Sequence, residues 1–234
     1  MISDSDLVNV HINETNTKAF VLNYDEYDDL AIIVVDKRYG KSKLQLETED
    51  FSEINDKITI LTSKETKYGK IINITHPVKF NYDNRNKMLD LMELEVAIKE
   101  GDSGSPVISN NKKVIGITTM ISADNQSVYA IPINDVINKI NSLEHGNIYR
   151  VNLGIKAANN VQDFKGVLLE EVYEKELASI AGLTSGDVIV KINDIEVEDI
   201  SDFRYYLYKI KRYELFEIEY YRNGIYYTTI LMAI

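Results

Sequence analysis

Short apolar runs, separated by turn-forming residues, fill roughly the first 130 residues and limit the folds open to the chain. Residues 7–12 alternate apolar and polar side chains, as in a half-buried strand, whereas residues 30–35 form a continuous apolar run that predicts a buried strand. Further strands are expected at 58–61, 71–74, 92–96 and 114–117. Strands this short, divided by turn-rich pieces such as 13–16 and 110–113, are typical of a barrel or a sandwich.

A helical face follows these strands. Apolar side chains recur at spacings of three and four between residues 133 and 140, which predicts a helix. The polar stretch 141–147 comes next and is expected to link two parts of the chain. We therefore expect two domains, of residues 1–145 and 146–234, in a chain long enough to give each its own core.

The second part mixes strands with two helices. One helix is expected at 174–181 and is stopped by Gly182, and another begins near Ser201, whose hydroxyl can cap it. Asn223-Gly224 is a strong signal for a two-residue hairpin turn between the last two strands. This mixture predicts an α+β domain, so the chain as a whole is expected to be mainly β.

Charge and composition exclude several classes of function. The chain has 26 Lys and Arg against 37 Asp and Glu, a net charge of −11, and no basic stripe, so we expect no nucleic-acid partner. It has no cysteine, and its histidines (His11, His76 and His145) are scattered, so neither a metal site nor a cofactor is expected. No apolar run is long enough to span a membrane, and the first residues lack the features of a signal peptide.

The most informative short motif is Gly101-Asp102-Ser103-Gly104-Ser105-Pro106, which leads directly into a predicted strand. A serine hydroxyl is a poor nucleophile unless it is held in the open beside a base, with donors ready for the oxyanion. Glycines at 101 and 104 let the backbone bend and let a substrate approach. We predict that Ser103 is a nucleophile and that the backbone N–H groups of Gly101 and Ser103 form an oxyanion hole. The alternative is a glycine-rich surface turn.

With this loop in its strand-loop-strand context, residues from about 1 to 140 resemble the trypsin-like proteases, and among them the HtrA (high-temperature-requirement) type. Residues 28–34, Asp-Asp-Leu-Ala-Ile-Ile-Val, are similar to the segment that carries the family's catalytic aspartate. The resemblance makes Asp29 the acid that orients the base, and the alternative is one more charge in an acidic turn. It implies a serine endopeptidase that cleaves unfolded or exposed protein segments through an acyl-enzyme.

The same resemblance places the floor of the S1 pocket at Ala97 and Ile98, shortly before the serine. No carboxylate occupies those positions to hold a basic side chain, so a small or aliphatic substrate side chain is expected there. Asp102 lies beside the nucleophile and is expected to face away from it and to stabilise the loop.

A catalytic triad also needs an imidazole, and the family pattern provides none inside this chain. The features that follow the family's histidine fall on Met1-Ile2 and Ser3-Asp4, which puts that histidine, and the opening strands of the first barrel, before Met1. None of His11, His76 and His145 is expected to be the base. A shortened chain, a misplaced gene start or split gene, and a true pseudoprotease are the alternatives. The alternative function is a non-catalytic peptide-binding or regulatory protein.

Residues from about 150 to 234 resemble a PDZ domain of the bacterial protease type. Residues 178–187 are similar to the family's Ala-x-x-Ala-Gly-Leu-x-x-Gly-Asp segment, and Leu153-Gly154-Ile155 to its carboxylate-binding loop. The resemblance implies that an extended peptide pairs with the strand after this loop and contacts Phe203 and Leu207 of the second helix. Plain core is the alternative role of those two side chains.

Together these resemblances imply a mainly β chain, with a partial trypsin-like β-barrel protease domain followed by an α+β PDZ domain. The implied partners are unfolded protein or peptide C-termini. Full-length relatives also imply a possible homo-oligomer, a trimer, and a place in the cell envelope or elsewhere outside the cytoplasm.

Overall fold

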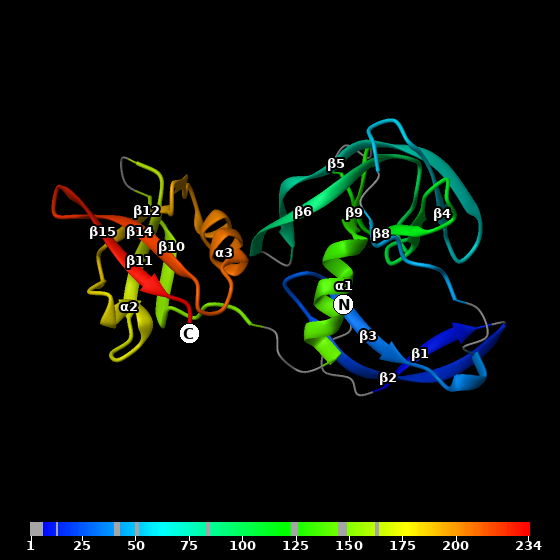
Figure 1. The fold of residues 1–234 in the computed structure, drawn as a ribbon, viewed down its shortest axis with the longest axis horizontal. Coiled ribbons are helices and arrows are strands. Elements are labelled where there is room, and N and C mark those ends of the chain that lie inside the picture. Colours follow the sequence, from blue (N-terminus) through cyan, green and yellow to red (C-terminus); the bar gives the residue numbers. More distant parts are fainter. Residues whose placement is uncertain are drawn as a thin grey trace. The chain divides into compact units, whose positions relative to one another are not determined.

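The computed structural model describes residues 7–12, 14–39, 43–49, 52–82, 85–122, 126–144, 149–161 and 164–234. These residues are mainly β, which confirms the predicted fold class. They divide into two compact units, one within residues 1–78 and 89–148 and the other within 79–88 and 149–234. Figure 1 follows the chain through both, from blue to red.

A three-stranded antiparallel sheet opens the first unit. Its strands β1 (Leu7–Ile12), β2 (Thr15–Asp25) and β3 (Leu30–Val34) lie in that order, and a 3-10 turn, η1 (Lys37–Tyr39), follows. The prediction of a strand at 30–35 is confirmed in position but wrong in burial, because Ile33 and Val34 are exposed. A continuous apolar run is buried only where layers cover both faces of its sheet. In β3, half-buried and exposed residues largely alternate instead.

Six strands then close into a barrel in the order β4-β5-β6-β9-β8-β7. They are β4 (Lys57–Leu61), β5 (Thr66–Tyr82), β6 (Arg85–Glu95), β7 (Pro106–Ile108), β8 (Val114–Ile121) and β9 (Val128–Pro132). Ile60, Ile71 and Leu94 are among the fully buried side chains that fill the barrel. Closure removes open sheet edges, so the loops between strands have a firm base.

Helix α1 (Ile133–Glu144) follows β9 and packs against β2 and β3 (Figure 1). The predicted helix at 133–140 is confirmed, but the helix continues into the stretch predicted as a linker. Leu143 explains the extension, since its side chain is buried and its carbonyl accepts a hydrogen bond from Nδ2 of Asn23 at 2.9 Å. Residues 145–148, with His145, lie outside the described residues, as do residues 1–6, on which the expected family features fall.

The second unit is built on a sheet of order β10-β11-β12-β14-β15, with the short β13 paired to β12. Its elements are β10 (Ile155–Asn159), β11 (Val167–Val172), α2 (Leu177–Ile180), β12 (Val188–Ile192), β13 (Ile195–Glu196), α3 (Ile200–Lys209), β14 (Leu215–Arg222) and β15 (Ile225–Met232). Leu153, Leu169 and Phe216 belong to its buried core. Strand β10 is an edge of the sheet. None of the helices in the described ranges is both long and apolar enough to cross a membrane.

Local backbone geometry adjusts the predicted helices of this unit. The helix expected at 174–181 is reduced to α2, because Lys175 has a left-handed φ of 66° that a helix cannot contain. Helix α3 is capped by Asp199, whose carboxylate accepts from the N–H groups of Ser201 and Asp202, so the predicted cap at Ser201 is wrong. The predicted hairpin turn is confirmed, with positive φ at both Asn223 and Gly224.

Candidate active site and peptide-binding loop

The loop that carries Ser103 joins β6 to β7 through two successive tight turns. The N–H of Asp102 donates to the carbonyl of Lys99 at 3.0 Å, and the N–H of Ser105 donates to the carbonyl of Asp102 at 3.2 Å. Gly101 and Gly104 have φ of 92° and 85°, a region that residues with a Cβ rarely enter. These turns leave the side chain of Ser103 exposed, as a nucleophile must be.

Asp102 stabilises its own loop, in keeping with its predicted role. Its Oδ2 accepts a hydrogen bond from the backbone N–H of Lys99 at 2.9 Å. The carboxylate is therefore engaged with the first of the two turns.

The N–H groups of Gly101 and Ser103 were predicted as oxyanion donors. Across the described residues, neither group donates a hydrogen bond to a protein acceptor. Both residues are exposed, so these donors are open to solvent and to a ligand. Both donors are available to a negatively charged oxygen.

Thr118 of β8 fixes the other side of the loop. Its carbonyl accepts from the N–H of Gly104 at 2.7 Å, and its N–H donates to the carbonyl of Ser105 at 3.0 Å. Its buried hydroxyl accepts from the N–H of Ser105 at 3.1 Å and lies 3.0 Å from the carbonyl of Asp102, to which it can donate. Backbone and side-chain hydrogen bonds of Thr118 thus both hold the loop against strand β8.

Asp29 ends the turn between β2 and β3, with a left-handed φ of 55°. Its Oδ2 accepts the hydroxyl of Thr119 at 2.9 Å, while the carbonyl of Thr119 accepts the hydroxyl of Ser103, also at 2.9 Å. Ser103 and Asp29, predicted as nucleophile and orienting acid, therefore meet through one shared neighbour.

The sequence analysis missed Thr119. Thr118 lies opposite Ala130 and Met120 opposite Tyr129, so Thr119 is an extra residue in a β-bulge with no partner on β9. A bulge frees the backbone groups of the added residue from the ladder and redirects its side chain. The polar pair Thr118-Thr119 inside an apolar strand was the available signal.

The described histidines lie elsewhere. His11 is exposed in β1 and its Nδ1 is 2.9 Å from Oδ1 of Asn16. His76 lies in β5 with Nε2 3.8 Å from Oε2 of Glu93. Within the ranges that the structure describes, no histidine hydrogen-bonds Ser103 or Asp29.

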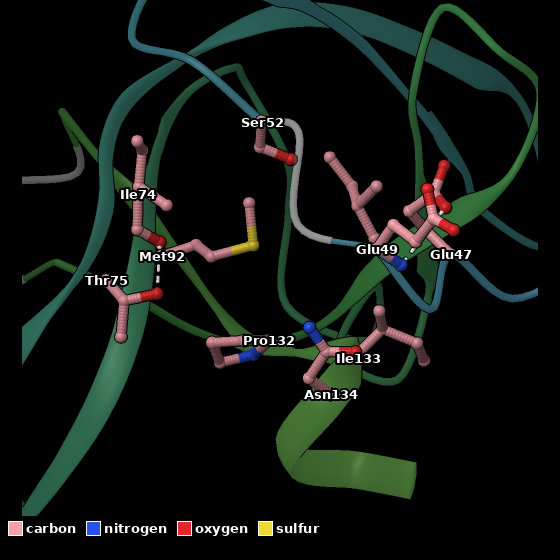
Figure 2. A pocket seen from close by; sticks show the side chains of 10 residues that line it. Glu47, Glu49, Ser52, Ile74, Thr75, Met92, Pro132, Ile133 and Asn134 are labelled. Carbon is pink, nitrogen blue, oxygen red and sulfur yellow. Dashed lines mark hydrogen bonds between the residues drawn. The ribbon is translucent and has the colours of Figure 1, made fainter.

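Ala97 and Ile98, predicted to form the S1 floor, lie at the start of the nucleophile loop. Ala97 is exposed, and Ile98 is half-buried against the barrel core. Figure 2 shows a separate cavity in the same unit, into which the thioether of Met92 points from β6, with Glu47 and Glu49 on one side. Neither Ala97 nor Ser103 lines that cavity, so it is distinct from the predicted S1 site.

Leu153-Gly154-Ile155 forms a tight bend before β10. Gly154 has a φ of 69°, and a Cβ placed there would lie 2.1 Å from Cβ of Glu176, so only glycine fits. The N–H of Tyr173 donates to the carbonyl of Gly154 at 2.9 Å, and Ile155 lies opposite Val172. In an antiparallel ladder this register turns the N–H and C=O of Ile155 away from β11, toward the open edge of the sheet.

Phe203 and Leu207 of α3 were predicted to contact a bound peptide. They are 3% and 5% exposed and belong to the core that also contains Leu153. The structure therefore places both inside the domain core.

An ion pair that the sequence analysis did not identify holds the segment after α2. The carboxylate of Asp187, 1% exposed, accepts from Nε and Nη2 of Arg222 at 2.6 and 2.7 Å. Nη2 of Arg222 also donates to the carbonyl of Gly182 at 2.8 Å. The hydrogen bonds to Asp187 raise the pKa of Arg222 above its usual range. Arg222 therefore bonds both ends of the segment from Gly182 to Asp187, with the bidentate contact at Asp187.

Comparisons with known proteins identify a domain family in each part of the chain. Residues 2–117 match the family model described as a trypsin-like peptidase domain, and residues 151–229 match a PDZ domain. The chain is 30% identical over 239 residues to a "Serine protease Do-like HtrA" of Lactococcus lactis subsp. lactis, covering 88% of this chain and 58% of that protein. It is 25% identical over 222 residues to a "Probable periplasmic serine protease do/HhoA-like" of Haemophilus influenzae, covering 87% of this chain and 47% of that protein.

A solved structure has the same fold. It is titled "HtrA-type protease AlgW with decapeptide", and it superposes with a TM-score of 0.69 at 22% identity, covering 98% of this chain and 75% of that chain. The present chain spans about half the length of the two curated relatives.

Proposed function

Because the chain is of HtrA type, with a trypsin-like serine protease domain followed by a PDZ domain, we propose that it is a serine endopeptidase that cleaves unfolded or exposed protein segments. One observation carries the proposal: the hydroxyl of Ser103 and the carboxylate of Asp29 both hydrogen-bond Thr119. Residues 1–145 would perform the cleavage and residues 146–234 the peptide recognition.

The proposed reaction passes through an acyl-enzyme. Oγ of Ser103 attacks the peptide carbonyl and gives its proton to an imidazole, which then protonates the leaving amine. The N–H groups of Gly101 and Ser103 stabilise the oxyanion, in keeping with their lack of protein acceptors in the described residues. Asp29 orients the imidazole and stabilises its protonated form. For the attack, the Ser103 hydroxyl exchanges the carbonyl of Thr119 for this base.

Ala97 and Ile98 are proposed to receive the substrate side chain next to the cleaved bond. Both side chains are small or aliphatic, and Ile98 rests on the barrel core, which gives it a firm position. The proposed preference is for small or aliphatic side chains, since a basic one would find no carboxylate partner at these positions.

The second unit is proposed to bind peptide C-termini. The bend at Leu153-Gly154-Ile155 would capture the terminal carboxylate, and the peptide would add to the sheet beside β10, whose edge position supports this mode. Phe203 and Leu207, which belong to the same buried core as Leu153, would form the floor beneath the last side chain.

The cellular context of the proposal comes from relatives. One of them is named as periplasmic, and we propose that this protein also acts outside the cytoplasm, in the cell envelope. A homotrimer of the full-length protein is proposed on the family pattern alone.

Active-site labelling tests the proposal. The protein expressed from its full native gene, treated with a fluorophosphonate, is expected to be modified at Ser103, and Ser103→Ala is expected to abolish the modification. Asp29→Asn should slow labelling strongly, because an amide cannot stabilise the imidazolium as a carboxylate does. A folded, full-length protein in which Ser103 stays unmodified would falsify the endopeptidase proposal.

A further inference from the structure

Two carboxylates and one ammonium group form a cluster at the turn that carries Asp29. The side chain of Asp25 is 0% exposed, that of Asp28 is 16% exposed, and Lys139 of α1 reaches both. Nζ of Lys139 lies 3.5 Å from Oδ2 of Asp25 and forms a closer ion pair with Oδ2 of Asp28. Asp28 directly precedes Asp29 in sequence, so the cluster connects the turn that carries Asp29 to helix α1.

Asp25 also shapes the backbone of the turn. Its Oδ1 accepts hydrogen bonds from the N–H groups of Tyr27 at 2.9 Å and Asp28 at 3.4 Å. Such side-chain bonds to the following backbone are what hold an Asx turn. The turn ends at Asp29 in a left-handed conformation, which aspartate adopts more readily than most residues with a Cβ.

Buried carboxylates need a compensating partner. A charge taken out of water loses its hydration, and removing one member of a buried pair leaves the other uncompensated. Lys139 contacts both acids, and α1 is itself fixed to β2 by the hydrogen bond from Asn23 to the carbonyl of Leu143. The lysine therefore attaches the turn to a stable element.

We propose that Lys139 and Asp25 are positioning residues for the protease reaction, holding the 26–29 turn so that the Asp29 carboxylate stays at Thr119, beside Ser103. This inference rests on the proposed roles of Asp29 and Ser103. In this proposal the orientation of the Asp29 carboxylate depends on Lys139, which is far from Asp29 in sequence and contacts neither the substrate nor the reacting atoms.

Acidic groups outnumber basic ones in and around the cluster. Besides Asp25, Asp28 and Lys139, the described charged residues of the turn and of the adjoining helical turn are Asp29, Glu26 and Asp135, and all three are exposed. Burial raises the pKa of Asp28, the charge of Asp25 adds to this, and Lys139 only partly offsets both.

Nuclear magnetic resonance on residues 1–234 tests the positioning directly and does not depend on activity. In Lys139→Met, the amide signals of Asp29 and Thr119 and the carboxyl signal of Asp29 are expected to shift as their hydrogen bond loosens. Lys139→Arg should restore them. Asn138→Ala, an exposed neighbour on the same helix, should leave them unchanged. Signals in Lys139→Met that match those of Asn138→Ala would overturn the proposal.

A second variant covers the case in which Lys139→Met does not fold. The double variant Asp28→Asn/Lys139→Met removes one carboxylate together with the ammonium, so less uncompensated charge remains. It is expected to fold and still to show displaced signals at Asp29 and Thr119. Unchanged signals in this folded variant would also overturn the proposal.

Kinetics separate this inference from the proposed function. In the full-length protein, Lys139→Met should lower the rate of fluorophosphonate labelling about tenfold, with KM for a peptide substrate unchanged and the rate restored by Lys139→Arg. Equal labelling of wild type and Lys139→Met would count against positioning. Unlabelled wild type would instead refute the endopeptidase proposal, and the resonance signals would then decide the structural role of Lys139.

Discussion

The hydroxyl of Thr119 donates to Oδ2 of Asp29 at 2.9 Å, and the carbonyl of Thr119 accepts from Oγ of Ser103 at the same distance. Two candidate catalytic groups that are far apart in sequence thus hydrogen-bond the same residue of a barrel strand. A shift of β8 would move both hydrogen-bonding groups of Thr119 together, which would keep the carboxylate of Asp29 and the hydroxyl of Ser103 in the same relative position.

Replacing Thr119 tests this relationship. Thr119→Val keeps the shape of the side chain and the backbone carbonyl but removes the hydroxyl that donates to Asp29. A hydrogen bond to a charged acceptor is worth about 1.5–3 kcal/mol, so labelling of Ser103 in the full-length protein should slow by about 10- to 100-fold. Thr119→Ser retains the donor and should react almost as fast as wild type. Equal rates for the Val and Ser variants would contradict the assignment.

Gly154→Ala is expected to impair the second domain. The substitution adds a Cβ at a φ of 69° and places it 2.1 Å from Cβ of Glu176, so the bend must open. Gly224→Ala is the matched control, because it has a similar φ of 88° with no atom closer than 4.0 Å. We expect Gly154→Ala to lower stability by about 1–3 kcal/mol more than the control and to abolish binding of a fluorescent C-terminal peptide. Peptide binding that survives in Gly154→Ala would argue against carboxylate capture at this bend.

Acid titration tests the cap of α3. Burial alone would raise the pKa of Asp199, but hydrogen bonds led by those from Ser201 and the N–H of Asp202 outweigh it and lower the pKa. The cap's electrostatic contribution is therefore fully present above the unfolded pKa of about 4 and is lost as pH falls through the lower folded value. Asp199→Ala should cost about 1 kcal/mol at neutral pH, measured by chemical denaturation, and less below pH 3. A difference that does not shrink with acidification would contradict this account.

Arg222→Met should destabilise the second domain strongly. The variant leaves the carboxylate of Asp187, 1% exposed, without its cation, and removes the donor to the carbonyl of Gly182. Breaking a buried pair in this way costs about 3 kcal/mol, which chemical denaturation would resolve. Arg204→Met, at an exposed position of α3, should be close to neutral. Similar losses in both variants would show that the ion pair contributes little.

The sequence predicted best those features that a short stretch of chain determines by itself. The bend around Ser103 was predicted because the two glycines that it requires, Gly101 and Gly104, lie within two residues of the serine. The hairpin at Asn223-Gly224 was found for the same reason, since both residues adopt positive φ. The fold class follows from strand spacing, which is also local.

Features set by contacts between distant segments were missed. Thr119 matters only because β8 gains one residue relative to β9, and neither strand shows that register by itself. Lys139 approaches Asp25 and Asp28 only after α1 packs against β2. Asp199 takes the cap because the chain enters α3 with an extended backbone there, and a serine two residues later offered an equally good local signal.

The bulge at Thr119 affects how the thermal stability of this barrel could change under selection. Deleting Thr119 would give β8 and β9 an uninterrupted ladder and remove the unpaired residue that the bulge adds. The same deletion would leave Asp29 and Ser103 with no residue in common. Selection for thermal stability alone should therefore favour loss of this residue, and selection for turnover should retain it. At the Thr119 bulge, selection for stability and selection for turnover therefore act in opposite directions.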